Sequence, residues 1–149
     1  MRVRLVALVC VVVLALGGAG TALALLLDGG PDYCGSLQAN QSIFADDGTG
    51  LQLITNLPQL EKLADQAPDD LSDEWQTFTT ALEQLRAALR AAGVAPGAFV
   101  DGRPPAGLSA EQRATIVRAA DAVSSADVVS AAGGIDQQAR DVCKLQLGL

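Results

Sequence analysis

Histidine is absent from the 149 residues of this chain. Its absence excludes Ser-His-Asp and Cys-His catalysis, HExxH zinc sites and haem ligation by histidine. Aromatic residues are scarce, with one Trp, one Tyr and three Phe. Leu, Val, Ile and Ala must therefore supply most of the buried surface, and small side chains at short spacing favour closely packed helices. No segment of useful length alternates apolar and polar residues, so the sequence predicts no strands.

Basic residues are few, with ten Lys and Arg against 17 Asp and Glu. Arg2 and Arg4 precede a long apolar run, whereas every acidic residue follows it. The part of the chain after the run therefore has eight basic minus 17 acidic residues, a net charge of −9. A domain this negative is repelled by phosphate backbones, so we expect no nucleic-acid partner.

The apolar run itself, residues 5–27, holds 23 residues without a charge. As a helix it would reach about 34 Å, enough for a hydrocarbon core of about 30 Å. Because Arg2 and Arg4 stand before it, the positive-inside rule places residues 1–4 in the cytoplasm and the chain after Asp28 outside the cell. The sequence thus predicts a single-pass membrane protein that meets the lipid bilayer through residues 5–27, with a linker at 28–33.

The alternative is a cleaved secretory signal peptide, with the small residues Ala22 and Ala24 at the cleavage site. The run is longer than the usual apolar region of about 7 to 15 residues, and it continues past that site. We therefore favour an uncleaved anchor over a secreted product beginning at Leu25. Both interpretations export the rest of the chain.

The three cysteines divide between these two parts of the chain. Cys10 lies inside the apolar run, where a thiol behaves as a small apolar side chain. Cys34 and Cys143 remain on the exported side, where disulfides persist, so we predict that they are bonded to each other. The chain-entropy model gives such a bond about 4 to 5 kcal/mol of stabilisation. Two lone cysteines without histidine make a poor metal site, and a redox-active pair is more often CxxC.

The clearest helical pattern lies in the middle of the chain. Apolar residues follow steps of four and three over three heptads, which predicts one buried seam. Its members are Leu71, Trp75, Phe78, Leu82, Leu85, Leu89 and Ala92. Pro68 followed by Asp69 and Asp70 suits the start of this helix, and Gly93 suits its end.

Weaker helical patterns flank the central helix. Residues 34–44 form a short seam, and residues 53–63 form a second one in which Pro58 implies a start or kink near Asn56. Ser109 and Gln112 form a capping box that opens a helix continuing to Val123.

The last helical stripe runs from Val128 to Val142 behind a cap at residues 124–127, although Gly133 and Gly134 should weaken its middle. Together these patterns predict an all-α fold. We expect an N-terminal transmembrane helix followed by a four- to five-helix bundle over 34–145, closed by one disulfide and ending in a tail at 146–149.

Three features together resemble uncharacterised exported or membrane-anchored small helical proteins of actinobacteria. They are Cys34 close to the membrane, the stretch APDDLSDEW at 67–75, and a C-terminal helix that ends in Cys143. The resemblance covers roughly residues 33–145, with Pro58 and the glycine pair at 133–134 departing from the pattern. It implies location and fold, but no chemistry.

With histidine absent, carboxylate side chains are the remaining candidates for catalysis. Asp69, Asp70, Asp73 and Glu74 form the densest acidic cluster, where a divalent cation or a carboxylate-dependent reaction has to be considered. We favour the plainer interpretation, in which acidic side chains at the start of a helix face solvent and stabilise the helix dipole. The sequence therefore predicts no enzyme, metal or cofactor site.

A Pro- and Gly-rich connection at 93–108 is longer than a compact bundle needs, and connections of this length are often functional or mobile. Phe99, Val100 and Arg103 are its candidate contacts for a partner. Two alternatives remain: the connection is a flexible tether, or Phe99 fills a gap in the core.

From these observations, the preferred function is a membrane-anchored extracytoplasmic helical module that binds an envelope protein. A ligand-binding or sensing domain comes second, and a carboxylate-dependent enzyme third.

Overall fold

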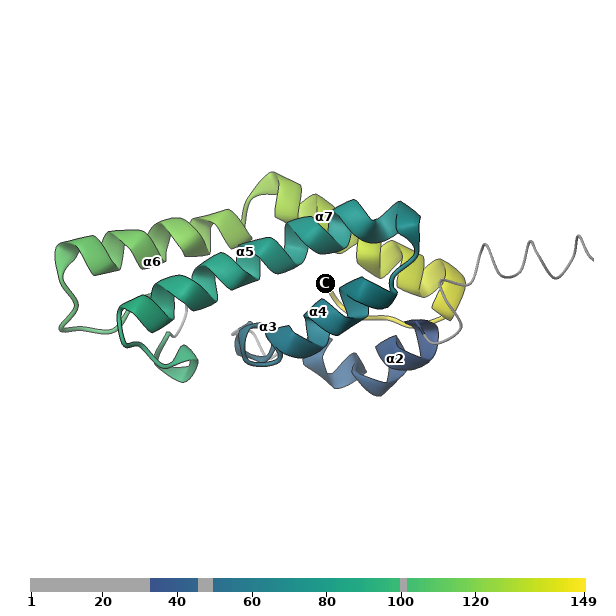
Figure 1. The fold of residues 1–149 in the computed structure, drawn as a ribbon, viewed down its shortest axis with the longest axis horizontal. Coiled ribbons are helices and arrows are strands. Elements are labelled where there is room, and N and C mark those ends of the chain that lie inside the picture. The colour runs from purple at the N-terminus through teal and green to yellow at the C-terminus, as the bar shows by residue number, and fades with distance from the viewer. Residues whose placement is uncertain (1–32, 46–49, 100–101) are drawn as a thin grey trace, which may run out of the picture.

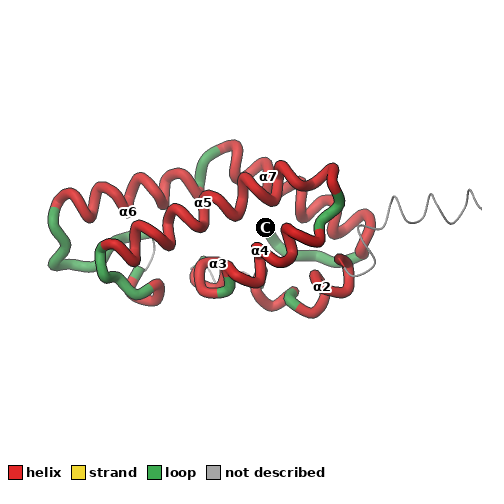
Figure 2. Tube along the Cα trace, in the orientation of Figure 1, coloured by secondary structure: helices red, strands yellow, loops and turns green. Residues whose placement is uncertain are grey.

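The computed structural model describes residues 33–45, 50–99 and 102–149. Figure 2 shows that this part of the chain consists of helices and loops, without a strand. The all-α prediction is therefore confirmed for the described ranges. The predicted span at 5–27 lies outside them, and no helix inside them is long and apolar enough to cross a bilayer.

Six α-helices lie in the described ranges, rather than the four or five expected. They are α2 (Tyr33–Ala39), α3 (Leu51–Thr55), α4 (Leu57–Gln66), α5 (Ser72–Ala91), α6 (Ala110–Val123) and α7 (Ala126–Gln138). Short 3-10 turns occupy Gln41–Phe44, Asp69–Leu71 and Pro96–Ala98, and a π-helical turn occupies Ala139–Cys143.

The additional helix arises at Asn56, where one predicted segment divides into α3 and α4. The backbone N–H of Asn56 donates to the Gln52 carbonyl at 2.9 Å and ends α3. Pro58 lies in the first turn of α4, where a missing N–H is tolerated because that donor has no intrahelical partner. The predicted break near Asn56 is thus confirmed.

The central helix α5 packs against α3, α4, α6 and α7 (Figure 1). Its predicted seam is confirmed, because Trp75, Phe78, Leu82, Leu85 and Leu89 are all buried. Residues spaced three or four positions apart lie on the same side of a helix, so this apolar seam gives α5 one continuous face on which neighbouring helices pack.

The two later helices begin at the predicted caps. In α6, the Ser109 hydroxyl accepts from the Gln112 N–H at 3.1 Å, and the Gln112 side chain accepts from the Ser109 N–H at 3.0 Å. In α7, the Ser125 hydroxyl accepts from the Val128 N–H at 3.4 Å. These bonds satisfy N–H groups that would otherwise lack partners in the first turn.

Helix α7 runs through Gly133 and Gly134 without a break, although the sequence predicts a weak middle there. A Cβ atom added at Gly134 would lie 3.1 Å from Cγ of Glu74 on α5, whereas one added at Gly133 would meet nothing within 4 Å. The glycine at 134 therefore lets α7 approach α5 closely.

The molecule is elongated, with a different pair of elements at each end (Figure 1). The C-terminal end of α5 and the start of α6 meet at one end, which we call the distal end. The opposite end holds α2 and the π-helical turn, which we call the disulfide end.

The last residues are part of the fold, although the sequence assigns residues 146–149 to a tail. Leu147 is only 3% exposed and belongs to the core, and Leu149 is half-buried. The Gln146 carbonyl accepts a hydrogen bond from the Gln41 side chain at 2.9 Å. The bundle therefore extends beyond position 145 as a short strap.

Candidate functional site

The predicted disulfide is present at the disulfide end. Cys34 in the first turn of α2 is bonded to Cys143 at the end of the π-helical turn, and their Cα atoms lie 5.2 Å apart. This separation is within the usual range for disulfides. The bond joins the first and last helical elements of the described chain across 109 positions of sequence.

An aromatic cluster lies in the core next to the disulfide. Trp75 Nε1–H donates to the Tyr33 hydroxyl oxygen at 2.9 Å, and the two rings meet edge to face at 86°. Both side chains are fully buried. Burial raises the pKa of Tyr33 to about 12, and the hydrogen bond from Trp75 opposes this rise only in part. Tyr33 is thus a neutral packing residue rather than a proton donor or acceptor near neutral pH.

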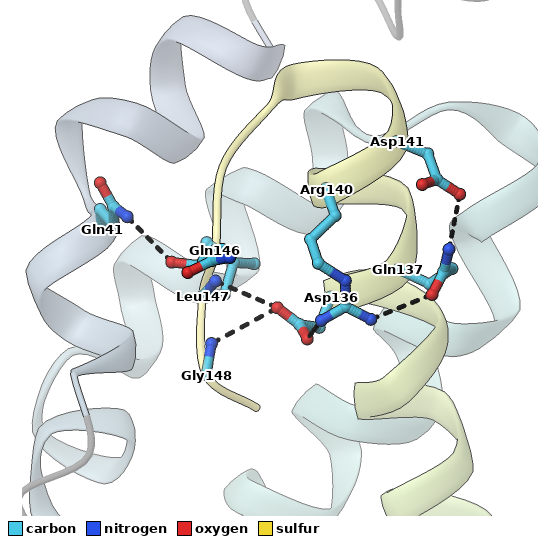
Figure 3. A network of polar contacts seen from close by, with 8 residues as sticks. All are labelled: Gln41, Asp136, Gln137, Arg140, Asp141, Gln146, Leu147 and Gly148. Atoms are coloured by element: carbon cyan, nitrogen blue, oxygen red, sulfur yellow. Dashed lines mark hydrogen bonds and ion pairs between the residues drawn. The ribbon is translucent and has the colours of Figure 1, made fainter.

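A second buried polar group fastens the C-terminal strap (Figure 3). One carboxylate oxygen of Asp136, Oδ1, accepts from the backbone N–H groups of Leu147 at 3.0 Å and Gly148 at 3.4 Å. The other, Oδ2, pairs with the Arg140 guanidinium one turn further along the chain. Asp136 is 6% exposed, so these bonds compensate the cost of burying its charge. The network is a structural device that ties the strap to the end of α7.

Three of the four acidic residues near the start of α5 lie on the surface, whereas Glu74 is half-buried and its Oε2 has no hydrogen-bond partner among the described residues. Asp69 and Asp70 form part of a 3-10 turn, Asp73 is in the first turn of α5, and all three are exposed. Asp73 also lines a shallow groove that Asp127 of α7 borders from the other side. The described ranges contain no group of three or more Cys, Asp and Glu residues placed to hold a metal ion.

An apolar hollow of about 310 Å³ lies between the 3-10 turn at Gln41–Phe44, α3, α5 and α7. Phe44, Leu53, Phe78 and Val128 line it, and none of the described residues around it is charged. Val129, which also borders the hollow, is 61% exposed. The hollow is therefore an apolar surface feature with the volume of a small ligand.

The three candidate contacts in the 93–108 connection have different positions. Phe99 is 9% exposed and packs in the core, as Val94 does, so its ring offers a partner little surface. This corrects its selection as a contact and agrees with the alternative that Phe99 plugs the core. Arg103 is exposed, and Val100 lies outside the described residues. Two apolar anchors thus hold part of this connection against the bundle.

Comparison with known proteins gives no relative from which a function can be transferred. No protein-family model matches this chain, no curated protein matches it, and no solved structure matches its fold. Any functional assignment therefore depends on the chain's own residues.

Proposed function

We propose that this chain is an extracytoplasmic helical domain, held at the cell membrane by residues 5–27, that binds another protein of the cell envelope. The disulfide between Cys34 and Cys143 is the observation that carries the first half of the proposal. Disulfides persist in oxidising compartments and are rare in the cytosol, and this one joins the first and last helical elements of the described chain.

The position of Cys34 supports attachment at the disulfide end. Only six residues, 28–33, separate the apolar run from Cys34, and a chain of that length spans at most about 20 Å. The disulfide end would thus stay close to the bilayer, and the distal end would be free to meet a partner.

A binding role, rather than catalysis, is supported by where the polar groups lie. Asp69, Asp70 and Asp73 are exposed at the start of α5, whereas the buried carboxylate of Asp136 is engaged by the strap and Arg140. We accordingly assign these carboxylates to helix electrostatics and to folding.

Topology is tested on intact cells with two measurements. Externally added protease should digest the domain after Asp28, and thiol labelling without reductant should leave Cys34 and Cys143 unmodified. Protection of the domain from protease, or free thiols at both positions, would exclude export. N-terminal sequencing separates the two exported forms, because a product beginning at Leu25 would be secreted rather than anchored.

A second candidate function, binding of a small apolar ligand, is favoured by the hollow lined by Phe44, Leu53 and Phe78. The two functions are separated by one pair of experiments on native membranes. A stoichiometric partner that co-purifies after cross-linking supports the interaction domain. A rise in melting temperature with short-chain fatty acids, weakened by Leu53→Gln and accompanied by no partner, supports the ligand-binding domain instead.

A further inference from the structure

The arginines of this acidic chain are concentrated in one segment. Residues 84–120 contain five arginines and two acidic residues, Asp101 and Glu111, which gives a net charge of +3. The rest of 33–149 contains three basic and 13 acidic residues, which gives −10. The domain is therefore strongly polarised in charge along its sequence.

The arginines of this segment belong to adjoining elements of the fold, although the acidic Glu111 lies among them in the first turn of α6. Arg86 and Arg90 lie toward the C-terminal end of α5, and Arg113 and Arg118 lie in the first two thirds of α6. The C-terminal end of α5 and the start of α6 meet at the distal end (Figure 1), so the parts of both helices that carry these arginines belong to the distal half of the molecule. Arg103 belongs to the connection between the two helices. The surplus of acidic residues belongs to the remainder of the domain.

Most of these arginines are free to meet a partner. Arg90, Arg103, Arg113 and Arg118 are exposed, and none of the four forms an ion pair with a described residue. Within the described ranges the ion pairs are Arg86 with Glu61, at 3.4 Å, and Arg140 with Asp136. Among the described residues, the Arg118 guanidinium donates to the hydroxyl of Thr115, three positions earlier, at 3.2 Å.

The neighbouring side chains indicate the class of partner. Val117 is 38% exposed and lies four residues after Arg113, so the two share a face of α6. Arginine mixed with exposed apolar side chains is characteristic of protein interfaces, in which lysine is depleted. The guanidinium group also matches a carboxylate with two parallel hydrogen bonds.

We propose that the distal end, through Arg90, Arg103, Arg113 and Arg118, binds a segment of another protein that is rich in Asp and Glu. This inference rests on the proposed function and names the surface and the partner chemistry. Since the whole chain carries a net charge of −7, an acidic partner would be repelled by the molecule as a whole. Attraction requires the local positive potential of the distal end.

The test uses the full chain in nanodiscs of uncharged phosphatidylcholine and a fluorescent glutamate-rich peptide, with binding followed by anisotropy. We expect binding at low salt that weakens steeply as ionic strength rises. The variant Arg90→Gln/Arg113→Gln should bind roughly tenfold more weakly, a difference of about 1.4 kcal/mol. The matched control, Lys62→Gln/Lys144→Gln, also removes two positive charges, but from exposed positions outside residues 84–120. Its affinity for the peptide should remain within about twofold of that of the parent.

Three results would overturn the inference. These are no peptide binding at low salt, an equal loss in the two variants, or binding to phosphatidylglycerol vesicles without binding to the peptide. Circular dichroism establishes that both variants fold, which is expected because all four substituted side chains are exposed. Peptide binding is measured on purified protein and does not depend on export. A failure here therefore leaves the protease and thiol results unaffected, and the reverse also holds.

Discussion

Trp75 on α5 donates its indole N–H to the hydroxyl of Tyr33 at 2.9 Å, across 42 positions of sequence and inside a fully buried cluster. Phe78 extends this cluster along α5, with its ring centroid 6.3 Å from that of Trp75. The bond therefore ties α2, and with it the disulfide at the neighbouring Cys34, to the central helix.

Replacing Tyr33 by Phe should lower the free energy of unfolding by about 1 to 3 kcal/mol, because the buried Trp75 N–H loses its acceptor. Urea unfolding followed by far-UV circular dichroism measures this directly, because that signal is also available in variants that lack the only Trp. The double variant Tyr33→Phe/Trp75→Phe is the control for coupling. If the bond matters, the two substitutions will not be additive. Full additivity, or a Tyr33→Phe variant as stable as the parent, would contradict this account.

Alkaline pH should destabilise the fold through the same residue. The pKa of Tyr33 is about 12 in the folded protein, against 10.0 ordinarily, so the folded state keeps its proton where the unfolded state loses it. The stabilisation is complete below pH 10 and is lost as pH rises from 10 toward 12, with a slope of at most about 1.4 kcal/mol per pH unit. Tyr33 is the only tyrosine, so the absorbance of its phenolate reports its titration alone.

The control for this pH effect is the Tyr33→Phe variant, which retains every Lys and Arg of the parent. The difference in stability between parent and variant should shrink from pH 10 to 12. A difference that stays constant over this range, or phenolate formation near pH 10 in the folded protein, would exclude the effect.

Reduction of the disulfide should remove about 4 to 5 kcal/mol of stability, given a loop of roughly a hundred residues. This is a large share of the total for a domain of this size, usually about 5 to 15 kcal/mol. Urea midpoints with and without reductant, and for Cys34→Ala/Cys143→Ala, provide the measurement. Cys10→Ala is the matched control and should change neither value. A loss below about 1 kcal/mol would indicate that the unfolded chain is already compact.

The parts of this fold that follow from the sequence are those set by local periodicity and capping. The seam of α5, the capping box at Ser109 and the break near Asn56 each depend on residues a few positions apart, so a single sequence predicts them. The disulfide is predictable for a different reason, because Cys143 is the only other cysteine beyond the apolar run.

Long-range polar contacts were not predictable in this way. Asp136 looks like any acidic residue of a helix, and its partners include backbone N–H groups 11 and 12 positions later, which have no sequence signature. The sequence alone therefore predicts a tail where Leu147 is buried. At the distal end the loop composition indicates only Arg103, whereas the charge of successive segments reveals the five arginines within 84–120.

The buried carboxylate of Asp136 should matter far more than its exposed partner Arg140. Asp136→Ala leaves the N–H groups of Leu147 and Gly148 without an acceptor and should cost about 1 to 3 kcal/mol. Arg140→Gln, on a side chain that is 42% exposed, should cost at most about 1 kcal/mol. Hydrogen exchange at Leu147 and urea unfolding measure the two effects. Unchanged protection of the Leu147 amide in Asp136→Ala would disprove the role assigned to the carboxylate.

The adjacent glycines of α7 provide a matched pair of substitutions whose effects should differ. Gly133 is exposed and has open space where a Cβ would lie, so Gly133→Ala should stabilise the protein by about 0.5 to 1 kcal/mol through helix propensity. Gly134→Ala gains the same propensity, but its Cβ would lie 3.1 Å from Cγ of Glu74, so the Glu74 side chain must move by a few tenths of an ångström to relieve the contact. We therefore expect Gly134→Ala to be the less stable of the two variants in thermal unfolding.

Gly134→Ala/Glu74→Ala should recover the difference, because it removes the atom that the new methyl group meets. Equal stabilisation by the two single substitutions would show that the close approach of α7 to α5 does not depend on Gly134.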